Sequence, residues 1–314
     1  MRVVVLDDYQ NVARGSGPWS QLGDDLDLVV HNGHIEDDDA LVELLASAQV
    51  VVAMRERTSF SRARLERLPD LRLLVTTGPR NAAIDLDAAR ERGIQVRGTG
   101  GLTAPTVELT WGLILALSRS IPAEDRQLRD GGWQHTLGAD LEGATLGVAG
   151  LGRLGSRVAS IGQAFGMRVC AWSQHLDHER ARAIGVEPVD RDTLFAQADV
   201  LTLHLVLSER TRGLVGAEQL RAMKPTALLV NTSRGPLVDE PALLDALRSG
   251  TIAGAALDVF NQEPLPAEHP LRGLPNVVLT PHLGYVSRGN YAIFYGEVVE
   301  DITAWLRGEP LRVL

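Results

Sequence analysis

Short apolar runs rich in β-branched residues alternate with helical patterns along almost the whole chain, and this alternation restricts the possible folds more than any other feature. The first series of apolar runs lies at 3–6, 28–30, 50–54, 72–77 and 94–98. Helical patterns separate these runs, at 37–48, 61–68 and 85–92. Alternation of strand and helix predicts a parallel sheet that is covered by helices on both faces.

A second series of apolar runs begins near the middle of the chain, at 145–150, 167–172, 199–205, 227–233, 252–259 and 276–280. Helical patterns again lie between the runs, at 153–165, 177–184, 216–223 and 239–249. The second series is longer than the first and predicts a second α/β sheet. We therefore expect an α/β fold with two Rossmann-like, doubly wound parallel-sheet domains.

Two further helical segments lie outside these series. The stretch 104–121 is mostly apolar and carries Pro105 near its start, which predicts one long helix buried between domains or subunits. The last helix is expected at about 290–307, with one apolar face made of Ile293, Phe294, Val298, Ile302 and Trp305. That face would allow the last helix to fold back onto the first domain.

Composition excludes several classes of function. A chain of 314 residues with 45% hydrophobic and 23% charged residues is typical of a globular protein of about two domains. The net charge of −9 argues against a nucleic-acid partner, and no apolar run is long enough to cross a membrane. The single cysteine, Cys170, excludes an internal disulfide and a cysteine-based metal site. We expect a soluble cytoplasmic protein that binds no metal and has no recognisable signal peptide.

The stretch TLGVAGLGRLGSRVAS contains G-x-G-x-x-G as Gly150, Gly152 and Gly155, directly after a predicted strand and at the start of a predicted helix. In this context the motif predicts a dinucleotide site. The first glycine permits the tight turn, the second lets the backbone approach a pyrophosphate, and the third allows close packing of helix and strand. A purely structural glycine turn is the alternative.

The residues after the next strand leave the choice of dinucleotide open. An acidic side chain at this place usually binds the adenosine ribose, whereas this chain has Ser173, Gln174 and His175. A carboxylate would repel the 2′-phosphate of NADP, and these three side chains would not. NAD(H) and NADP(H) therefore both remain candidates, and a plain polar loop is the alternative for the three residues.

Polar residues also follow three later strands of the second series, namely Arg234, Asp258 with Glu263, and His282. Parallel strands end at one edge of their sheet, and ligands bind outside that edge. Arg234 is suited to bind a carboxylate, His282 to transfer a proton, and Glu263 to stabilise the imidazolium. Taken singly, the three fit a surface salt bridge, a capping histidine and a solvated loop acid. Together, beside a dinucleotide turn, they favour a catalytic site.

Several blocks of sequence, in the same order, resemble the D-isomer-specific 2-hydroxyacid dehydrogenases over nearly the full chain. These blocks are VAGLGRLGSRVA, LHLVLSERTRGLVG, MKPTALLVNTSRGPLVDEPAL, AALDVFNQEPLP and TPHLGY. The resemblance implies a substrate domain of residues 1–101 plus 284–314, and a dinucleotide domain of residues 102–283. It also implies a cleft between the domains and a homodimer.

The resemblance also assigns roles to individual residues. It implies that His282 is the acid/base, Glu263 its partner, and Arg234 the anchor for the substrate carboxylate and carbonyl. It implies hydride transfer between nicotinamide and C2 of a small 2-oxo or D-2-hydroxy acid. The further residues that it implies around the cofactor are Arg153, Leu154, His204, Thr211, Thr232 and Asp258.

The substrate loop of the first domain departs from the family pattern. Its stretch TTGPRNAAIDL keeps Gly78 but has Arg80, and it has two alanines in place of Asp-Asn. Backbone N–H groups near Thr77–Gly78 are expected to bind a carboxylate as an anion nest. Arg80 and Arg55 follow predicted strand ends and hint at a substrate with a second anionic group. The alternative is that they form solvated or inter-domain salt bridges.

Two other functions remain open. The same Arg, Glu and His would suit oxidation of another small anion, such as phosphite. A dinucleotide-sensing protein that recruits partners, with catalysis secondary, is a hypothesis from another class, although the sequence shows no recruitment tail.

Overall fold

The computed structural model describes all residues, 1–314, and divides them into two compact units. One unit consists of Met1–Leu102 together with Val286–Leu314, and the other of Thr103–Tyr285. We call them the terminal unit and the central unit. Each is built on one fully parallel sheet, so the predicted α/β class with two parallel-sheet domains is confirmed.

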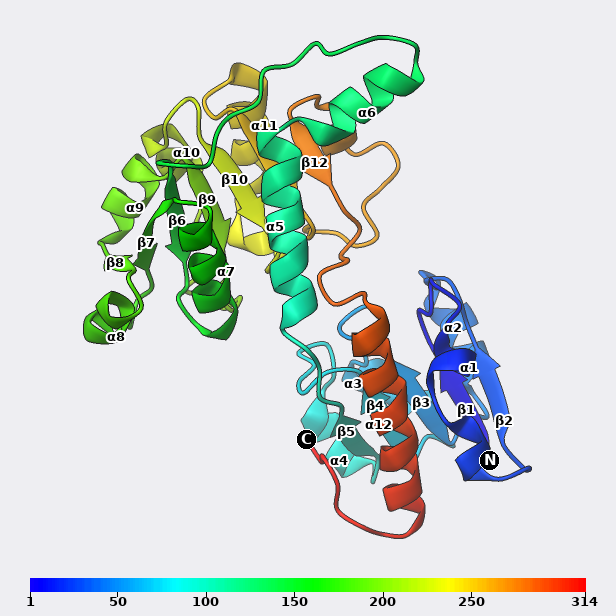
Figure 1. Cartoon of the computed structure of the whole chain (residues 1–314). Helices are drawn as coiled ribbons and strands as arrows, with labels where there is room; N and C mark the ends of the chain where they lie inside the picture. Colours follow the sequence, from blue (N-terminus) through cyan, green and yellow to red (C-terminus); the bar gives the residue numbers. More distant parts are fainter. The chain divides into compact units, whose positions relative to one another are not determined.

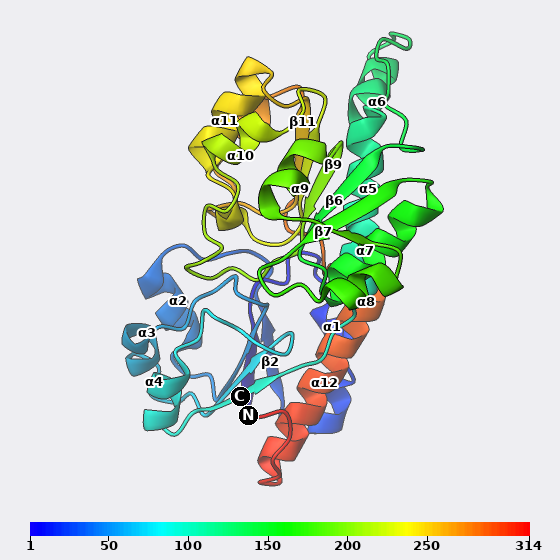
Figure 2. The same cartoon turned by 90° about the vertical axis from the view of Figure 1, so that its left-hand side faces the viewer.

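The sheet of the terminal unit has five strands in the order β2-β1-β3-β4-β5. The strands are β1 (Arg2–Val5), β2 (Asp27–Val30), β3 (Val50–Ala53), β4 (Leu73–Thr76) and β5 (Gln95–Gly98). One face is covered by α2 (Asp38–Leu45), α3 (Arg62–Glu66) and α4 (Leu86–Glu91). The other face carries α1 (Ala13–Ser16), the short helix η1 (Trp19–Leu22) and α12 (Arg288–Leu306), as Figures 1 and 2 show.

The last helix, α12, brings the end of the chain back to the first sheet. Phe294, Val298 and Ile302 are buried, whereas Ile293 and Trp305 are half-buried. These residues recur at helical spacing and therefore share one face of α12. This face packs against the sheet of the terminal unit, at β4.

The sheet of the central unit has seven strands in the order β12-β11-β10-β9-β6-β7-β8. The strands are β6 (Thr145–Ala149), β7 (Arg168–Trp172), β8 (Glu187–Pro188), β9 (Val200–Leu203), β10 (Leu228–Asn231), β11 (Gly254–Leu257) and β12 (Val277–Leu279). The chain reverses its direction of travel across the sheet between β6 and β9. Ligands bind at such a switch point in open α/β sheets, so the topology alone selects the carboxyl ends of β6 and β9.

Helices cover both faces of the seven-stranded sheet (Figures 1 and 2). One apolar cluster joins the sheet to α5 (Ala104–Ser118), α7 (Arg153–Ala164) and α8 (His178–Ala183). A second cluster joins the opposite face to α9 (Arg191–Gln197), α10 (Ala217–Ala222) and α11 (Glu240–Ser249). The short helices η2 (Gly235–Leu237) and η3 (Pro270–Gly273) follow β10 and β11. Cys170 is buried within β7.

The predicted helix 104–121 is shorter in the structure, and this part of the prediction was wrong. Helix α5 ends at Ser118, and Ser120 adopts a left-handed conformation with φ 51°. A new helix, α6, then runs from Ile121 to Arg129, with Pro122 in its first turn. Because proline lacks the backbone donor, it fits the start of a new helix better than the interior of a continuing one.

No helix is both long enough and apolar enough to cross a bilayer. No group of three or more His, Cys, Asp or Glu side chains has an arrangement that would hold a metal ion.

Candidate active site

The glycine turn lies between β6 and α7, at the switch point of the larger sheet. Gly150 has φ +100°, and a Cβ there would lie 2.5 Å from the carbonyl oxygen of His204. A Cβ on Gly155 would overlap the carbonyl oxygen of Gly150. These two glycines are therefore required by the backbone packing itself. Gly152 differs, because no atom lies within 4 Å of the position its Cβ would take, so the space beside it is open.

The first turn of α7 is suited to bind an anion. Its N-cap is Gly152, no side chain caps it, and no acidic residue lies in the first turn. The first N–H groups of a helix have no partner inside the helix, and the helix dipole adds positive potential there. Arg153 and Leu154 are the first two residues of α7, and Arg153 is exposed. These donors fit the pyrophosphate of a dinucleotide.

The end of β7 carries no carboxylate that could bind a ribose. Ser173 is half-buried, whereas Gln174 and His175 are exposed. The first acidic residue, Asp177, is the N-cap of α8 and accepts a hydrogen bond from the N–H of Arg180 at 3.0 Å. Its side chain is thus already used by the helix.

Three more residues expected around the cofactor lie at or beyond the ends of β9 and β10. His204 follows β9 and its ring bonds the hydroxyl of Thr202 at 3.0 Å; burial lowers its pKa to about 4, so the ring is neutral near pH 7. Thr232 is buried and its hydroxyl bonds that of Thr110 at 2.8 Å. The hydroxyl of Thr211 holds the local loop, by accepting the N–H of Ser208 at 2.8 Å.

His282 and Glu263 come together at the adjacent ends of β11 and β12. The Nδ1 of His282 lies 2.5 Å from Oε2 of Glu263. The other carboxylate oxygen of Glu263 accepts the N–H of Phe260 at 2.9 Å, which fixes the direction of the carboxylate. Both side chains retain some exposure, 17% for the histidine and 25% for the glutamate. A carboxylate on Nδ1 leaves Nε2 as the ring atom able to exchange a proton with a ligand.

Arg234 follows β10, on the neighbouring strand. The side chain of Asn231 holds the intervening turn from both sides, because it donates to the carbonyl of Arg234 at 2.9 Å and accepts the N–H of Ser233 at 3.0 Å. A Cβ on Gly235 would overlap the backbone of Phe260. The turn that carries Arg234 therefore packs backbone to backbone against the loop that carries Glu263. Arg234 itself is half-buried.

The terminal unit contains the other residues expected to bind substrate. The N–H of Thr77 donates to Ala53 at 3.0 Å, and the N–H of Gly78 donates to the hydroxyl of Thr99 at 2.7 Å. Both N–H groups are already bonded, so the prediction that this pair forms an open anion nest was wrong. The two N–H groups could bind an anion only after breaking these bonds.

Arg55 is the more prominent feature at this edge of the terminal unit. It follows β3 with φ 53°, and a Cβ on Gly78 would overlap its guanidinium. Asn81 donates to its carbonyl at 2.5 Å, and Thr77 accepts its N–H at 3.0 Å. A left-handed conformation in a residue with a side chain is costly and persists where neighbours hold it, often at a functional site. Arg80 lies on the exposed loop after β4.

Sequence reasoning missed the residues that shape the site through their backbone or ring. Phe260 acts through its N–H, and the ring of Tyr285 lies edge-on to His282 with centroids 5.6 Å apart. Gly235 was not singled out, and its close approach to the backbone of Phe260 is seen only in the structure. The pairing of Phe260 with Glu263 has no signal in the sequence.

Comparisons with known proteins show which family the chain is similar to. Residues 111–284 match the family model described as "D-isomer specific 2-hydroxyacid dehydrogenase, NAD binding domain". A glyoxylate reductase of Aeropyrum pernix is 42% identical over 78% of this chain and 76% of its own length. A glyoxylate reductase of Korarchaeum cryptofilum is 39% identical over 88% of this chain and 82% of its own. The crystal structure of a phosphoglycerate oxidoreductase from Vibrio cholerae O395 has 39% identity and a TM-score of 0.93, covering 98% of this chain and 99% of that one.

The open space at Gly152 gives a direct test of cofactor binding. We expect Gly152→Ala to fold normally, because the added methyl meets no protein atom, but to bind NADH and NADPH at least about tenfold more weakly. Gly112→Ala in α5 is the matched control, since its added methyl also meets no atom. Fluorescence titration measures both affinities. Equal affinities in the two variants would place the pyrophosphate elsewhere.

Proposed function

Because the chain belongs to the D-isomer specific 2-hydroxyacid dehydrogenase family, we propose that it interconverts a small 2-oxo acid and its D-2-hydroxy acid, with His282, Glu263 and Arg234 as the catalytic residues. Family membership makes the protein an oxidoreductase that uses NAD(H) or NADP(H). We assign dinucleotide binding to the central unit and substrate binding in part to the terminal unit. The observation that carries the proposal is the 2.5 Å contact between Nδ1 of His282 and Glu263, at the carboxyl edge that also carries the glycine turn.

The proton is handled by His282 and Glu263. The negative carboxylate on Nδ1 stabilises the imidazolium form of the ring, in which Nε2 carries the proton that is transferred. In the direction of reduction, Nε2 gives this proton to the substrate oxygen, and in oxidation it takes the proton back. When bound, the nicotinamide supplies or accepts the hydride at C2.

Arg234 binds and orients the substrate. A guanidinium holds a carboxylate through two parallel hydrogen bonds, and it also stabilises negative charge that develops on the neighbouring oxygen. Asn231 and Gly235 fix the turn on which Arg234 lies, so the side chain is presented from a rigid backbone.

We further propose that Arg55 and Arg80 bind a second anionic group on the substrate, and so decide whether a substrate with such a group is accepted. The relatives differ in this respect, since some are named for glyoxylate and others for phosphoglycerate. The left-handed backbone of Arg55 and its position over Gly78 support a ligand-binding role for this guanidinium.

A spectrophotometric panel at 340 nm tests the function. The reduced cofactors are paired with glyoxylate, hydroxypyruvate, pyruvate, bulkier 2-oxo acids and 3-phosphohydroxypyruvate, and the oxidised cofactors with phosphite. We expect turnover of at least one 2-oxo acid, and its loss by about 100-fold or more in His282→Ala, with cofactor affinity retained. His269→Ala, at a half-buried histidine bonded to Glu240, is the control. Turnover of phosphite alone, or no turnover with stoichiometric protein partners in a pull-down, would contradict the proposal.

We propose that the cofactor site accepts NADP(H) as well as NAD(H). No carboxylate at the end of β7 would repel a 2′-phosphate, and Asp177 is bound to its own helix. We expect Ser173→Asp to shift the ratio of NADPH to NADH affinity by about tenfold toward NADH, since the new carboxylate repels the phosphate and bonds the ribose. Ser249→Asp, at the last residue of α11, is the control for added charge. An unmoved ratio would mean that Ser173 does not face the ribose.

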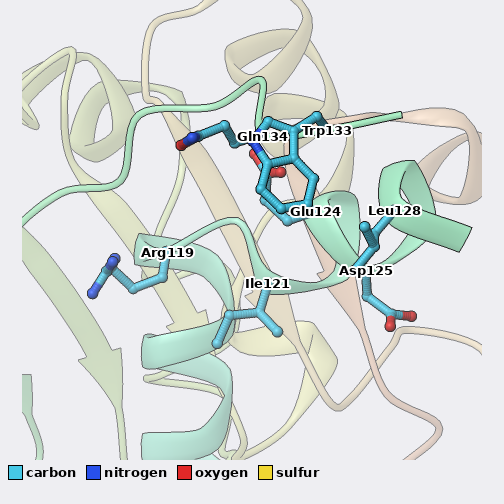
Figure 3. A pocket seen from close by; sticks show the side chains of 7 residues that line it. All are labelled: Arg119, Ile121, Glu124, Asp125, Leu128, Trp133 and Gln134. Carbon is cyan, nitrogen blue, oxygen red and sulfur yellow. The ribbon is translucent and has the colours of Figure 1, made fainter. Parts of the chain in front are cut away.

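We also propose a homodimer formed through α6 and the segment after it. Ile121, Leu128, Trp133 and Leu137 are exposed by 52%, 59%, 72% and 99%, and none of the residues of α6 is buried. Ile121 and Leu128 of α6 and Trp133 of the next segment line a hollow of about 550 Å³. Figure 3 shows how these side chains lie. Exposed apolar clusters of this kind are typical of interfaces.

Charges of both signs border the hollow, which suits a second copy of the same surface. In sedimentation velocity we expect a dimer, and we expect the double variant Trp133→Ser, Leu137→Ser to be a monomer. A wild-type protein that sediments as a monomer at micromolar concentration would contradict this.

We propose the cytoplasm as the location of the protein. The single thiol, Cys170, is buried, and burial raises its pKa to about 11, which is compatible with a reducing compartment.

A further inference from the structure

His282 has an unusual backbone conformation. Its φ is 54°, in the left-handed region that residues with a Cβ rarely adopt. The residue before it is Pro281, and Gly284 follows two positions later. Such a conformation is costly and persists only where other contacts hold it. The contacts that hold His282 therefore decide where its imidazole points.

The backbone of the turn is tied to β11 and its extension. The N–H of Thr280 donates to the carbonyl of Leu257 at 3.0 Å, which continues the pairing of β12 with β11. The N–H of His282 then donates to the carbonyl of Asp258 at 2.8 Å. The main chain of Asp258 is thus hydrogen-bonded to the turn at His282.

The carboxylate of Asp258 makes three more bonds to the same turn. Its Oδ1 accepts the hydroxyl of Thr280 at 2.6 Å and the N–H of Leu283 at 2.7 Å. Its Oδ2 accepts the N–H of Gly284 at 2.9 Å. Thr280 precedes His282 in sequence, and Leu283 and Gly284 follow it. The buried carboxylate of Asp258 therefore bonds the chain on both sides of the left-handed His282. Asp258 is 0% exposed.

Helix α5 holds the far end of the turn. The hydroxyl of Thr106 donates to the carbonyl of Gly284 at 2.8 Å. A Cβ on Gly284 would lie 3.2 Å from Oδ2 of Asp258 and 3.4 Å from the side chain of Thr106. Gly284 is therefore enclosed between the carboxylate and the helix, and the turn has little room to relax.

We infer that Asp258 is a positioning residue, whose carboxylate holds the turn 280–284 and thereby directs the imidazole of His282 toward Glu263. This inference rests on the proposed function of His282 but not on the identity of the substrate. It differs from the role that family resemblance implies for Asp258, a contact of the nicotinamide, because the hydrogen bonds of this carboxylate go to the turn.

The chemistry of the side chain supports this role. Three donors converge on Asp258, and an ionised carboxylate only accepts hydrogen bonds, so it matches all three. Burial raises the pKa of this carboxyl, while the bonds from Thr280, Leu283 and Gly284 and the nearby His282 act in the opposite direction. An amide in its place would turn an N–H₂ group toward at least one backbone N–H. The turn would then lose a bond and gain a repulsive contact.

The test compares Asp258→Asn with two variants of Thr280 and one control. Thr280→Val removes only the hydroxyl donor, whereas Thr280→Ser keeps it. Asp199→Asn is the control, because Asp199 also accepts a backbone N–H, from Thr145 at 2.8 Å, but pairs with Lys224 away from the turn. Circular dichroism and urea unfolding establish that each variant folds.

The decisive readout is the NMR spectrum of histidine-labelled protein without substrate, in which the proton between Nδ1 of His282 and Glu263 gives a downfield resonance. We expect this resonance to be lost in Asp258→Asn, weakened in Thr280→Val, and retained in Thr280→Ser and in the control. With the best substrate from the panel, kcat should fall by about 100-fold in Asp258→Asn while the Kd for NADH changes by less than about tenfold.

An unchanged resonance together with a large loss of NADH affinity would overturn the inference and make Asp258 a cofactor contact. If Asp258→Asn does not fold, Thr280→Val and Thr280→Ser decide: equal resonances in the two would overturn it. If the wild-type protein turns over no 2-oxo acid, the proposed function fails, yet the resonances still report whether Asp258 positions His282.

Discussion

In a parallel sheet every strand ends at the same edge, and this constraint governs the central unit. Strands β10, β11 and β12 are neighbours, and the chain leaves them at Asn231, Leu257 and Leu279. Residues that are separated by tens of positions in sequence are therefore delivered to adjacent places. The glycine turn after β6 lies on that same edge, two strands from β10. A cofactor bound there lies beside side chains that the topology has already gathered.

Short turns whose polar groups are hydrogen-bonded then fix the positions of the side chains at this edge. The Asn231 side chain holds the turn before Arg234, the N–H of Phe260 fixes Glu263, and Asp258 spans the turn that carries His282. In each case a buried or half-buried polar group is bound to backbone that lies within a few residues of the functional side chain. Groups fixed in this way need little reorganisation when a ligand binds, which is the condition for electrostatic stabilisation and for proton transfer at a set distance.

Much of the architecture was predictable, because strand and helix periods differ and each repeats along this chain. Both parallel sheets and most helices were predicted, and so was the family, since several sequence blocks recur in order. Helix 104–121 was predicted too long, because the left-handed Ser120 and the restart at Ile121 depend on local backbone choices that an apolar run does not reveal. Helix α6 was missed for the same reason.

The site was predictable in its residue types but not in its contacts. A histidine after a strand and an acid in a neighbouring loop could be named from sequence, but their 2.5 Å contact depends on how two loops pack. The donors at Thr77 and Gly78 were expected to be open, and the structure uses them in bonds to Ala53 and Thr99. Such bonds join residues far apart in sequence, so no local pattern records them.

A crystal structure with bound cofactor and oxamate, a non-reactive analogue of a 2-oxo acid, tests the central claim most directly. We predict that Nε2 of His282 and the guanidinium of Arg234 will both lie within hydrogen-bonding distance of the oxamate, with Nδ1 still on Glu263. An imidazole turned away from the ligand, or an oxamate bound without contact to either side chain, would contradict this account.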